Sequence, residues 1–372
     1  MQKRRRVVYL PIEITVRELD AKLLLAIEAL KHGCEVIIGQ KWLMEANVPY
    51  MPPGLIMSKT LTKRDGLTSK LAKQHGYVTA AIDEEMPGLV ASKEKLRWVD
   101  PDTVAATDLV MCVGEDHRAA MIGRFPETAS RCRVVGNPRW DLLRPGVRDY
   151  YRPVAEALRR QHGRFILVNT NSGIVNSVKG SPEQVLKRQI RWGKIDPTKE
   201  ADQRLMEDRA RFRESNFATM KEILRQLPGR FPDHRIVLRP HPNELVETWR
   251  EYLKDVPRII IDQSHAAAAW IMAAEALVHT NCTTGAEAYA LERPAICVEP
   301  LETDTCLNYL AHYVNFRATD VESTLAAVER HLCPALERFA YPAEFAETYR
   351  RFISAGTGDL ATTRVLRPCS RR

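Results

Sequence analysis

Residues 277–300 read LVHTNCTTGAEAYALERPAICVEP, and this stretch decides the fold. An apolar run ends in a turn of small and hydroxyl residues, a helix of small residues begins there, and a second apolar run follows a proline. This order is typical of a strand, a helix and the next strand of a βαβ unit. The start of such a helix presents unpaired backbone N–H groups, which bind phosphate. The residues expected at this anion site are Asn281, Thr283, Thr284 and Gly285, with the Glu287 carboxylate one turn later as a partner for the hydroxyls of a sugar or ribose.

The same alternation of apolar runs and helical periodicity recurs along the chain and predicts an α/β protein with two doubly wound, Rossmann-like domains. The first domain is expected to hold strands at 7–10, 36–38, 77–82, 109–113 and 133–135. The second is expected to hold strands at 165–169, 235–238, 259–261, 277–279 and 295–298. Two such domains in tandem predict a central cleft at the carboxyl ends of their strands, where a ligand binds.

The domain boundaries follow from the breaks between these two series. We expect a first domain over 1–150 and a second over 151–345. Residues 172–215 are polar and charged without strand signals, so they are interpreted as a helical insertion in the second domain. Residues 346–372 are expected to form a C-terminal helix and a basic tail.

Composition indicates an ordinary cytoplasmic protein. The chain has 372 residues, which suggests two domains, with 45% hydrophobic and 27% charged residues. No apolar stretch approaches the roughly 20 residues that span a bilayer. The start, MQKRRRVVYLPIEI, has an apolar run too short for a signal peptide. The 8 cysteines are scattered without a Cys-x-x-Cys pair, which favours reduced thiols over disulfides or a zinc site.

The net charge of +8 is concentrated partly at the two ends of the chain, in Lys3–Arg6 and after Arg364. Two interpretations are equally supported. These ends are either solubilising tails or basic segments that dock on an anionic inner-membrane surface or a phosphorylated substrate. Only 7% of the residues are aromatic and no nucleic-acid-binding module is present, so no nucleic-acid partner is expected.

Two polar segments follow strands of the second domain. Arg239 and His241 alternate with prolines directly after the strand RIVL, and this stiff turn places a guanidinium and an imidazole where they can face phosphate oxygens. A histidine in such a turn serves equally well as a structural hydrogen-bonding group. The anion site before Gly285, in the same domain, favours the functional reading. Asn169 and Asn171 close another strand, where amides bind phosphate or sugar or simply form a turn.

Acidic residues follow strands of the first domain. Asp83, Glu84 and Glu85 come after the strand YVTAAI. Three adjacent acids are most often solvated, but at a strand end one carboxylate can act as general base or nucleophile while another orients it. Glu13 and Arg17 follow the first strand and are assigned to the acceptor side, although Glu13 can also complement a helix dipole.

Several motifs of other enzyme classes are absent from the sequence. There is no Gly-x-Gly-x-x-Gly, no Walker loop and no Gly-x-Ser-x-Gly, so dehydrogenase, ATPase and α/β-hydrolase functions lose their main support. Asp100-Pro101-Asp102 has the spacing of a metal-binding pair, but its proline favours a plain turn. No metal ion and no cofactor are predicted.

Six segments together resemble a known family. They are LPIEITVRELDAKLLLA (10–26), DEEMPGLV (83–90), VVGNPRWDLLRP (134–145), FILVNTNSGIVN (165–176), RPHPNE (239–244) and HTNCTTGAEAYALERPAI (279–296). In this order they resemble the bacterial surface carbohydrate biosynthesis protein family, which is similar to glycosyltransferases of the GT-B fold. The His-Pro pair, the hydroxyl pair and the acidic segment also resemble those of sialyltransferases, polysialyltransferases and Kdo transferases, which use CMP-activated sugars.

The resemblance implies a metal-independent glycosyltransferase with a nucleotide-sugar donor and a glycan or lipid-linked acceptor. It implies that His241 binds the CMP phosphate or acts as general acid, that Thr283 and Thr284 bind the same phosphate, and that Glu287 binds the ribose. One carboxylate among residues 83–85 would act at the acceptor or the anomeric carbon. Two residues separate these acids from Gly88, which departs from the family pattern and leaves open which carboxylate is catalytic.

Two alternatives remain open. The Gly-Asn-Pro turn at Gly136 and the two-domain layout also resemble the UDP-N-acetylglucosamine 2-epimerases, which need acid and base groups on both faces of the sugar. A non-catalytic nucleotide-sugar-binding or assembly protein is the other alternative.

Overall fold

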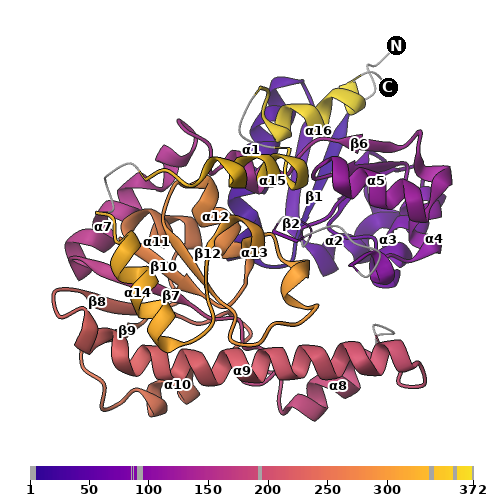
Figure 1. Cartoon of the computed structure of the whole chain (residues 1–372). Helices are drawn as coiled ribbons and strands as arrows, with labels where there is room; N and C mark the ends of the chain where they lie inside the picture. The colour runs from indigo at the N-terminus through magenta and orange to yellow at the C-terminus, as the bar shows by residue number, and fades with distance from the viewer. Residues whose placement is uncertain are drawn as a thin grey trace. The chain divides into compact units, whose positions relative to one another are not determined.

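The computed structural model describes residues 6–84, 86, 88–89, 95–191, 195–334, 339–354 and 358–370. The chain divides into two compact units. Unit 1 comprises Met1–Arg148 and Glu347–Arg372, and unit 2 comprises Asp149–Ala346. The break after Arg148 lies two residues before the expected boundary at 150. Residues Glu347–Arg372 at the end of the chain belong to unit 1 (Figure 1).

Unit 1 is built on a six-stranded parallel sheet with the order β2-β1-β3-β4-β5-β6. The strands are β1 (Val7–Ile12), β2 (Glu35–Gln40), β3 (Leu55–Ser58), β4 (Val78–Ile82), β5 (Leu109–Cys112) and β6 (Cys132–Val134). All six residues of β1 are buried, because helices cover both faces of a doubly wound sheet. The edge strand β2 is only partly covered.

Helices connect the strands of unit 1 and cover its sheet. They are α1 (Thr15–Lys31), α2 (Lys41–Asn47), α3 (Lys63–Gln74), α4 (Pro101–Ala105), α5 (Glu115–Arg124), α6 (Pro138–Asp141) and α16 (Ala361–Ser370), with short 3-10 turns η1 (Val48–Tyr50), η2 (Lys95–Trp98) and η3 (Pro126–Thr128). The returning α16 is held by Asp141, whose carboxylate accepts the backbone N–H groups of Ala361 and Thr362, both at 2.8 Å. Val365 and Leu366 of α16 are buried in the same core as Leu25 of α1.

Unit 2 has a second six-stranded parallel sheet, with the order β12-β11-β10-β7-β8-β9. Its strands are β7 (Phe165–Asn169), β8 (Arg235–Arg239), β9 (Ile259–Ile261), β10 (Ala276–His279), β11 (Ala295–Val298) and β12 (Phe316–Ala318). The helices of unit 2 are α7 (Arg152–His162), α8 (Pro182–Arg191), α9 (Glu200–Arg230), α10 (Val246–Tyr252), α11 (Ala267–Ala273), α12 (Thr283–Ala290), α13 (Ala311–Val314) and α14 (Val321–His331), with the 3-10 turn η5 (Cys306–Asn308). The 3-10 turn η4 (Arg148–Tyr151) and helix α15 (Ala343–Phe352) each begin in one unit and end in the other. The α/β fold with two doubly wound parallel sheets is therefore confirmed.

Helix α9 differs from the expected insertion. It has 31 residues and continues to Arg230, well past the expected end at 215 (Figure 1). Its second half carries Met220, Ile223, Leu224 and Leu227 at helical spacing, and all four pack in the core of unit 2. The first half of α9 also buries Asp202, Phe212 and Arg213, so the charged pattern there concealed a partly buried helix.

Within the described residues, no helix combines the length and the apolar character needed to cross a membrane.

Candidate functional site

Three neighbouring strands of unit 2 end in polar segments at the carboxyl end of the sheet. β7 lies between β10 and β8, with His279 opposite Asn169 and Asn169 opposite Arg239. Because these strands are parallel, the segments that follow them lie side by side. The structure thus gathers at one end of this sheet Asn169, Asn171, Arg239, His241, Asn281, Thr283, Thr284, Gly285 and Glu287.

Glu244 fixes two of these segments. Its buried carboxylate accepts hydrogen bonds from the Ser172 backbone N–H at 2.8 Å and the Thr170 hydroxyl at 2.9 Å, both after β7. It also accepts the His241 backbone N–H at 3.2 Å and the Trp249 indole N–H at 2.9 Å. Burial raises the pKa of Glu244, against the opposing effect of these donors. One side chain therefore fixes the His241 turn relative to the end of β7.

The ring of His241 has a defined orientation. Its Nδ1 accepts the backbone N–H of Asn243 at 3.1 Å. A nitrogen that accepts carries no proton, so the neutral imidazole carries its proton on Nε2. The turn thus makes Nε2 the atom that donates.

The turn between β10 and α12 is held in place by a hydrogen bond to Glu299. Asn281 adopts a left-handed backbone conformation with φ of 45°, which is strained for a residue other than glycine. Its Nδ2 donates to Glu299 Oε1 at 2.6 Å, and His312 Nδ1 lies 2.9 Å from Glu299 Oε2. These contacts hold the strained turn, which places the N-terminus of α12 at the end of the sheet.

Gly285 allows α12 to lie close to β10. A Cβ atom at this position would lie 2.3 Å from Asn315 Oδ1 and 2.5 Å from the His279 ring, distances that real Cβ atoms do not show. His279 itself is fully buried with its Nε2 3.0 Å from Asn315 Oδ1, and burial lowers its pKa to about 4. His279 is therefore a neutral core residue near pH 7, which agrees with its position inside a strand.

Several buried polar atoms at this end of the sheet have no hydrogen-bond partner among the described residues. They are both side-chain polar atoms of Asn169, Oδ1 of Asn281, Oγ of Ser172 and Nε of Arg239. Buried polar groups in folded proteins are nearly always paired, so a group of unpaired ones marks a place where a polar ligand or water completes them. Four unsatisfied side chains on three adjacent strand ends fit a ligand with several polar groups.

Arg239 is partly buried at the end of β8, with its Nε atom buried. Its Nη2 donates to the His265 carbonyl at 2.8 Å, and burial lowers its pKa although Glu287 and Asp262 act in the opposite direction. Glu287 is itself buried. The guanidinium of Arg239 therefore interacts electrostatically with the carboxylates of Glu287 and Asp262.

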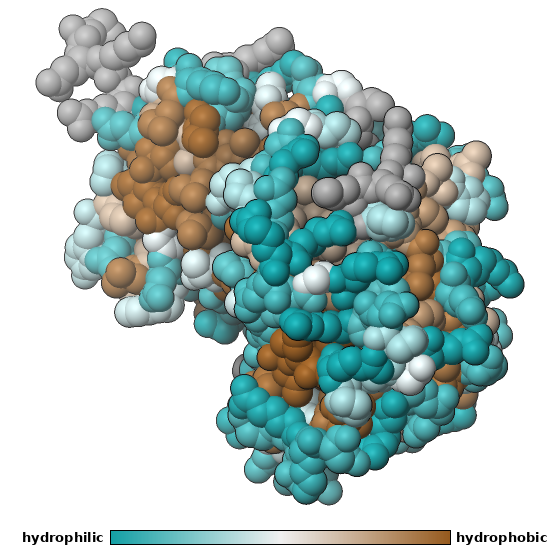
Figure 2. Space-filling view, turned by 90° about the vertical axis from the view of Figure 1, so that its left-hand side faces the viewer, coloured by the Kyte–Doolittle hydropathy of each residue, from teal (hydrophilic) through white to brown (hydrophobic). Residues whose placement is uncertain are grey.

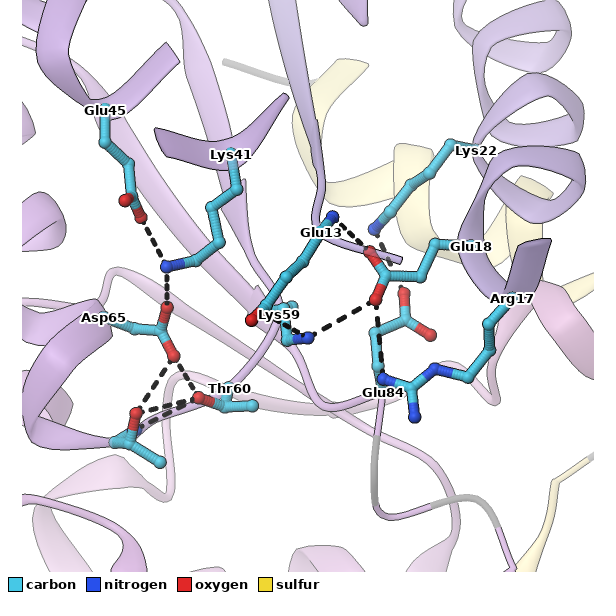
Figure 3. Close-up of polar contacts among 11 residues, drawn as sticks. Glu13, Arg17, Glu18, Lys22, Lys41, Glu45, Lys59, Thr60, Asp65 and Glu84 are labelled. Atoms are coloured by element: carbon cyan, nitrogen blue, oxygen red, sulfur yellow. Dashed lines mark hydrogen bonds and ion pairs between the residues drawn. The ribbon is translucent and has the colours of Figure 1, made fainter. Parts of the chain in front are cut away.

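In unit 1, charged side chains gather at the carboxyl ends of β1 and β3 (Figure 3). Lys59, after β3, lies 2.5 Å from Glu13 Oε2 and 3.3 Å from the buried Glu18 Oε1. Burial raises the pKa of Glu13, but the Lys59 ammonium outweighs this and the pKa lies below its ordinary value. Arg17 contacts Glu18 at 3.5 Å. The structure thus brings the two expected acceptor-side residues, Glu13 and Arg17, into one ionic network.

The acidic segment after β4 is only partly described. Glu84 is buried and forms an ion pair with the equally buried Lys22, with Nζ 3.1 Å from Oε1 (Figure 3). Burial raises the pKa of Glu84, but Lys22 and Arg139 outweigh it and lower the pKa. Asp83 is half-buried and accepts the Met86 backbone N–H at 3.1 Å. Glu85 lies outside the described residues.

The sequence did not reveal three residues that form buried polar contacts beside the predicted site residues of unit 1 and unit 2. Lys22 lies on the buried face of α1, and a lone lysine on the apolar side of a predicted helix is a signal that was available. Glu244 ends the RPHPNE segment but was not singled out. Arg213 gave no signal, because it lies within a run of charged residues typical of an exposed helix.

No group of three or more His, Cys, Asp or Glu side chains that could hold a metal ion occurs in the part of the chain that the structure describes.

Comparison with protein-family models gave no match, and comparison with curated proteins gave none either. The family resemblance therefore remains an expectation. Solved structures do match over almost the whole chain. The UDP-GlcNAc 2-epimerase from Methanocaldococcus jannaschii has a TM-score of 0.59 at 12% identity, covering 99% of this chain and 100% of that chain.

Two further solved structures are similar to the same extent. The UDP-GlcNAc 2-epimerase from Neisseria meningitidis bound to UDP-GlcNAc has a TM-score of 0.59 at 10% identity, covering 99% of this chain and 100% of that chain. The wall teichoic acid polymerase TagF has a TM-score of 0.58 at 11% identity, covering 99% of this chain and 90% of that chain. At such low identity the likeness shows the fold, and the chain has a GT-B-like fold of two Rossmann-like units.

Proposed function

We propose that this chain is a glycosyltransferase of surface-glycan biosynthesis that transfers a sugar from a nucleotide-activated donor to a glycan or lipid-linked acceptor. The unpaired buried polar atoms at the ends of β7, β8 and β10 carry the proposal. They lie beside an imidazole Nε2–H donor and a helix N-terminus, both of which suit phosphate. The GT-B-like fold, shared with a teichoic acid polymerase and with two enzymes named for UDP-GlcNAc, supports a nucleotide-sugar ligand.

In the proposed reaction, the bond between the anomeric carbon and the phosphate oxygen breaks, and its electron pair stays on the phosphate. His241 Nε2, the backbone N–H groups at the start of α12 and the Thr283 and Thr284 hydroxyls stabilise that charge without a metal ion. The acceptor hydroxyl oxygen forms the new bond to the anomeric carbon, and its proton passes to a carboxylate. Asp83 is half-buried whereas Glu84 is buried, so Asp83 is the more accessible candidate for this base.

We further propose that the donor is CMP-linked, with a nonulosonate or Kdo as the sugar. The support is the order of the motifs: an Arg-Pro-His-Pro turn after β8, a hydroxyl pair at the start of α12, and Glu287 within α12 as partner for the ribose.

A panel of CMP, CDP, UDP and GDP in a thermal-shift assay tests this assignment. Ligand binding to the folded state raises its stability by RT ln(1 + [L]/Kd), so a hundredfold excess over Kd adds about 2.7 kcal/mol. We expect CMP to stabilise the wild type most and His241→Ala to lose about tenfold or more in CMP affinity, because a charge-assisted hydrogen bond is removed. Stabilisation by UDP without CMP would reject the CMP donor.

The fold neighbours favour one second candidate, a UDP-GlcNAc 2-epimerase-like activity. Product analysis separates the two. A transferase releases free nucleotide and elongates an acceptor, whereas an epimerase converts the sugar without needing an acceptor.

We also propose that unit 1 contacts an anionic membrane surface. Large hydrophobic side chains are exposed on three consecutive elements at the edge of its sheet, namely Leu23, Ile27 and Leu30 of α1, Ile37 of β2, and Trp42 and Leu43 of α2. Figure 2 shows a broad hydrophobic surface on the molecule. The sequence adds basic residues directly before β1, at Lys3–Arg6. Apolar side chains with flanking basic residues suit an anionic bilayer, where each basic residue contributes about 1 kcal/mol.

Vesicle co-sedimentation measures this contact. We expect binding to vesicles with phosphatidylglycerol, weak binding to pure phosphatidylcholine, and loss of binding in high salt or in the variant Ile27→Ser/Leu30→Ser. Equal sedimentation with both lipids would contradict the proposal. A stable dimer in solution that the same variant dissociates would assign these side chains to a second copy of the chain instead.

A further inference from the structure

A pocket of about 280 Å³ lies in unit 2 beside the His241 turn. On one side it is lined by residues that follow β7 and β8, namely Asn171, His241 and Asn243. Its other side is formed by the insertion between β7 and β8, including Ser177, Lys179 and Arg188 from the segment through α8 and Arg213 from α9. The insertion therefore adds a wall to the proposed donor site.

This wall is bonded to the turn that it faces. The Val178 backbone N–H donates to the Asn243 carbonyl at 3.0 Å, and the Leu245 backbone N–H donates to the Asn176 carbonyl at 3.1 Å. Between these bonds, Ser177 and Glu244 form an antiparallel bridge. The position of the insertion next to His241 is thus set by backbone hydrogen bonds.

The pocket is cationic and lacks a compensating charge. None of its lining residues is acidic. Among the described residues, Lys179, Arg188 and Arg213 form no ion pair with a carboxylate, and the side-chain partners of the two arginines are neutral. Arg188 donates instead to the Lys179 carbonyl at 2.6 Å. Like charges around one pocket repel each other, and an anion bound between them offsets this unfavourable electrostatic energy.

Arg213 is the strongest evidence for a bound anion, because this charged residue is only 6% exposed. It donates to the Asn171 carbonyl at 2.8 Å and to the Tyr309 hydroxyl at 2.7 Å, both neutral acceptors. The Asn171 amide oxygen can face the same guanidinium at 3.2 Å. Buried arginines are normally paired with carboxylates or bound anions, since an isolated buried charge is costly.

We propose that this pocket holds a second negatively charged group of the donor, in addition to the phosphate next to the nucleoside. The inference rests on the proposed nucleotide-sugar function. The group is an oxyanion, either the carboxylate of an acidic sugar or the β-phosphate of a diphosphate nucleotide. Lys179 and Arg188 hold it by charge-assisted hydrogen bonds, and Arg213 keeps the Asn171 segment in place beneath it. A donor with a neutral sugar on a single phosphate leaves these cations uncompensated and binds more weakly.

The test compares ligands with and without the second anion. Affinities are measured by calorimetry for CMP, CDP and CMP-N-acetylneuraminate, and for UMP, UDP and UDP-glucuronate. The pocket variant is Lys179→Gln/Arg188→Gln, which spares the buried Arg213 and so retains the fold. The matched control is Lys187→Gln/Arg191→Gln, which removes two exposed positive charges of α8, the helix that carries Arg188, outside the pocket.

We expect the wild type and the control to bind the ligand with the second anion at least about tenfold more tightly than the monophosphate of the same base. The pocket variant should lose that difference while its affinity for the monophosphate stays within about twofold. Preference for the diphosphate identifies a β-phosphate, and preference for the sugar conjugate alone identifies the carboxylate.

Three outcomes overturn the inference. If the pocket variant matches the control for every ligand, the cations bind nothing in the donor. If it loses affinity for CMP or UMP as strongly as for the larger ligands, the pocket holds the first phosphate. In both cases the proposed function stands. Absence of binding by the wild type to all six ligands would reject the proposed function and this inference together.

Discussion

Glu244→Ala is expected to lower the free energy of unfolding by about 4 kcal/mol and to abolish measurable donor binding. The substitution leaves the Ser172 and His241 backbone N–H groups and the Trp249 indole N–H without their acceptor, and each unsatisfied buried donor costs about 1–3 kcal/mol. The ends of β7 and β8 then lose their common anchor. Urea denaturation followed by tryptophan fluorescence, together with calorimetry for the nucleotide, measures both effects.

Two further variants separate loss of this anchor from a change of charge. Glu247→Ala removes an exposed acid on α10, whose partner Arg250 is also exposed, and should change stability by less than about 0.5 kcal/mol. Glu244→Gln keeps the shape but turns one oxygen into a donor facing other donors, so an intermediate loss is expected. If Glu244→Ala kept wild-type stability and affinity, Glu244 would not be the anchor of these segments.

The strands that the sequence predicted share a clear signal. β7, β9 and β11 coincide with the expected ranges because each is an apolar run with breaks on both sides. β3 and β12 were missed. β3 has only four residues and follows two prolines and a glycine, and β12 has three residues with an exposed arginine at its centre. Pairing with neighbouring strands, and not local propensity, makes such segments strands.

The grouping of the site residues was also predictable, since parallel strands place their carboxyl ends at the same end of a sheet. Asn169, Arg239 and Asn281 were expected at the ligand site for this reason, and the structure places all three at the end of one sheet. The roles of individual side chains were less accessible. Contacts such as Arg213 to Asn171, 42 residues apart, depend on how a helix crosses a sheet, which no local pattern encodes.

The partners of the carboxylates of unit 1 could not be predicted from local sequence patterns either. Nothing in the sequence distinguishes Glu84 from its acidic neighbours, yet the structure buries it against Lys22. Glu84 therefore has a structural role, the ion pair with Lys22, whatever its role in catalysis. A substitution of Glu84 alone cannot separate the structural role from a catalytic one. Substitution of its partner can.

Lys22→Met is therefore expected to lower the free energy of unfolding by about 3–5 kcal/mol, because it leaves the Glu84 carboxylate buried without its counter-charge. The double variant Lys22→Met/Glu84→Gln removes both charges and should recover most of that stability. Lys70→Met breaks a comparable but exposed pair, 2.7 Å from Asp102, and should cost less than about 1 kcal/mol. Urea denaturation of the four proteins gives these differences.

The double variant also assigns the role of Glu84 in the proposed transfer. If Glu84 only holds the segment after β4, a stable double variant keeps its transfer activity, and Asp83 remains the candidate base. If Glu84 takes the acceptor proton, the double variant is stable but loses turnover by two or more orders of magnitude, the usual contribution of a general base. Equal stability of Lys22→Met and Lys70→Met would instead contradict the buried ion pair itself, since burial is what makes the loss of one partner costly.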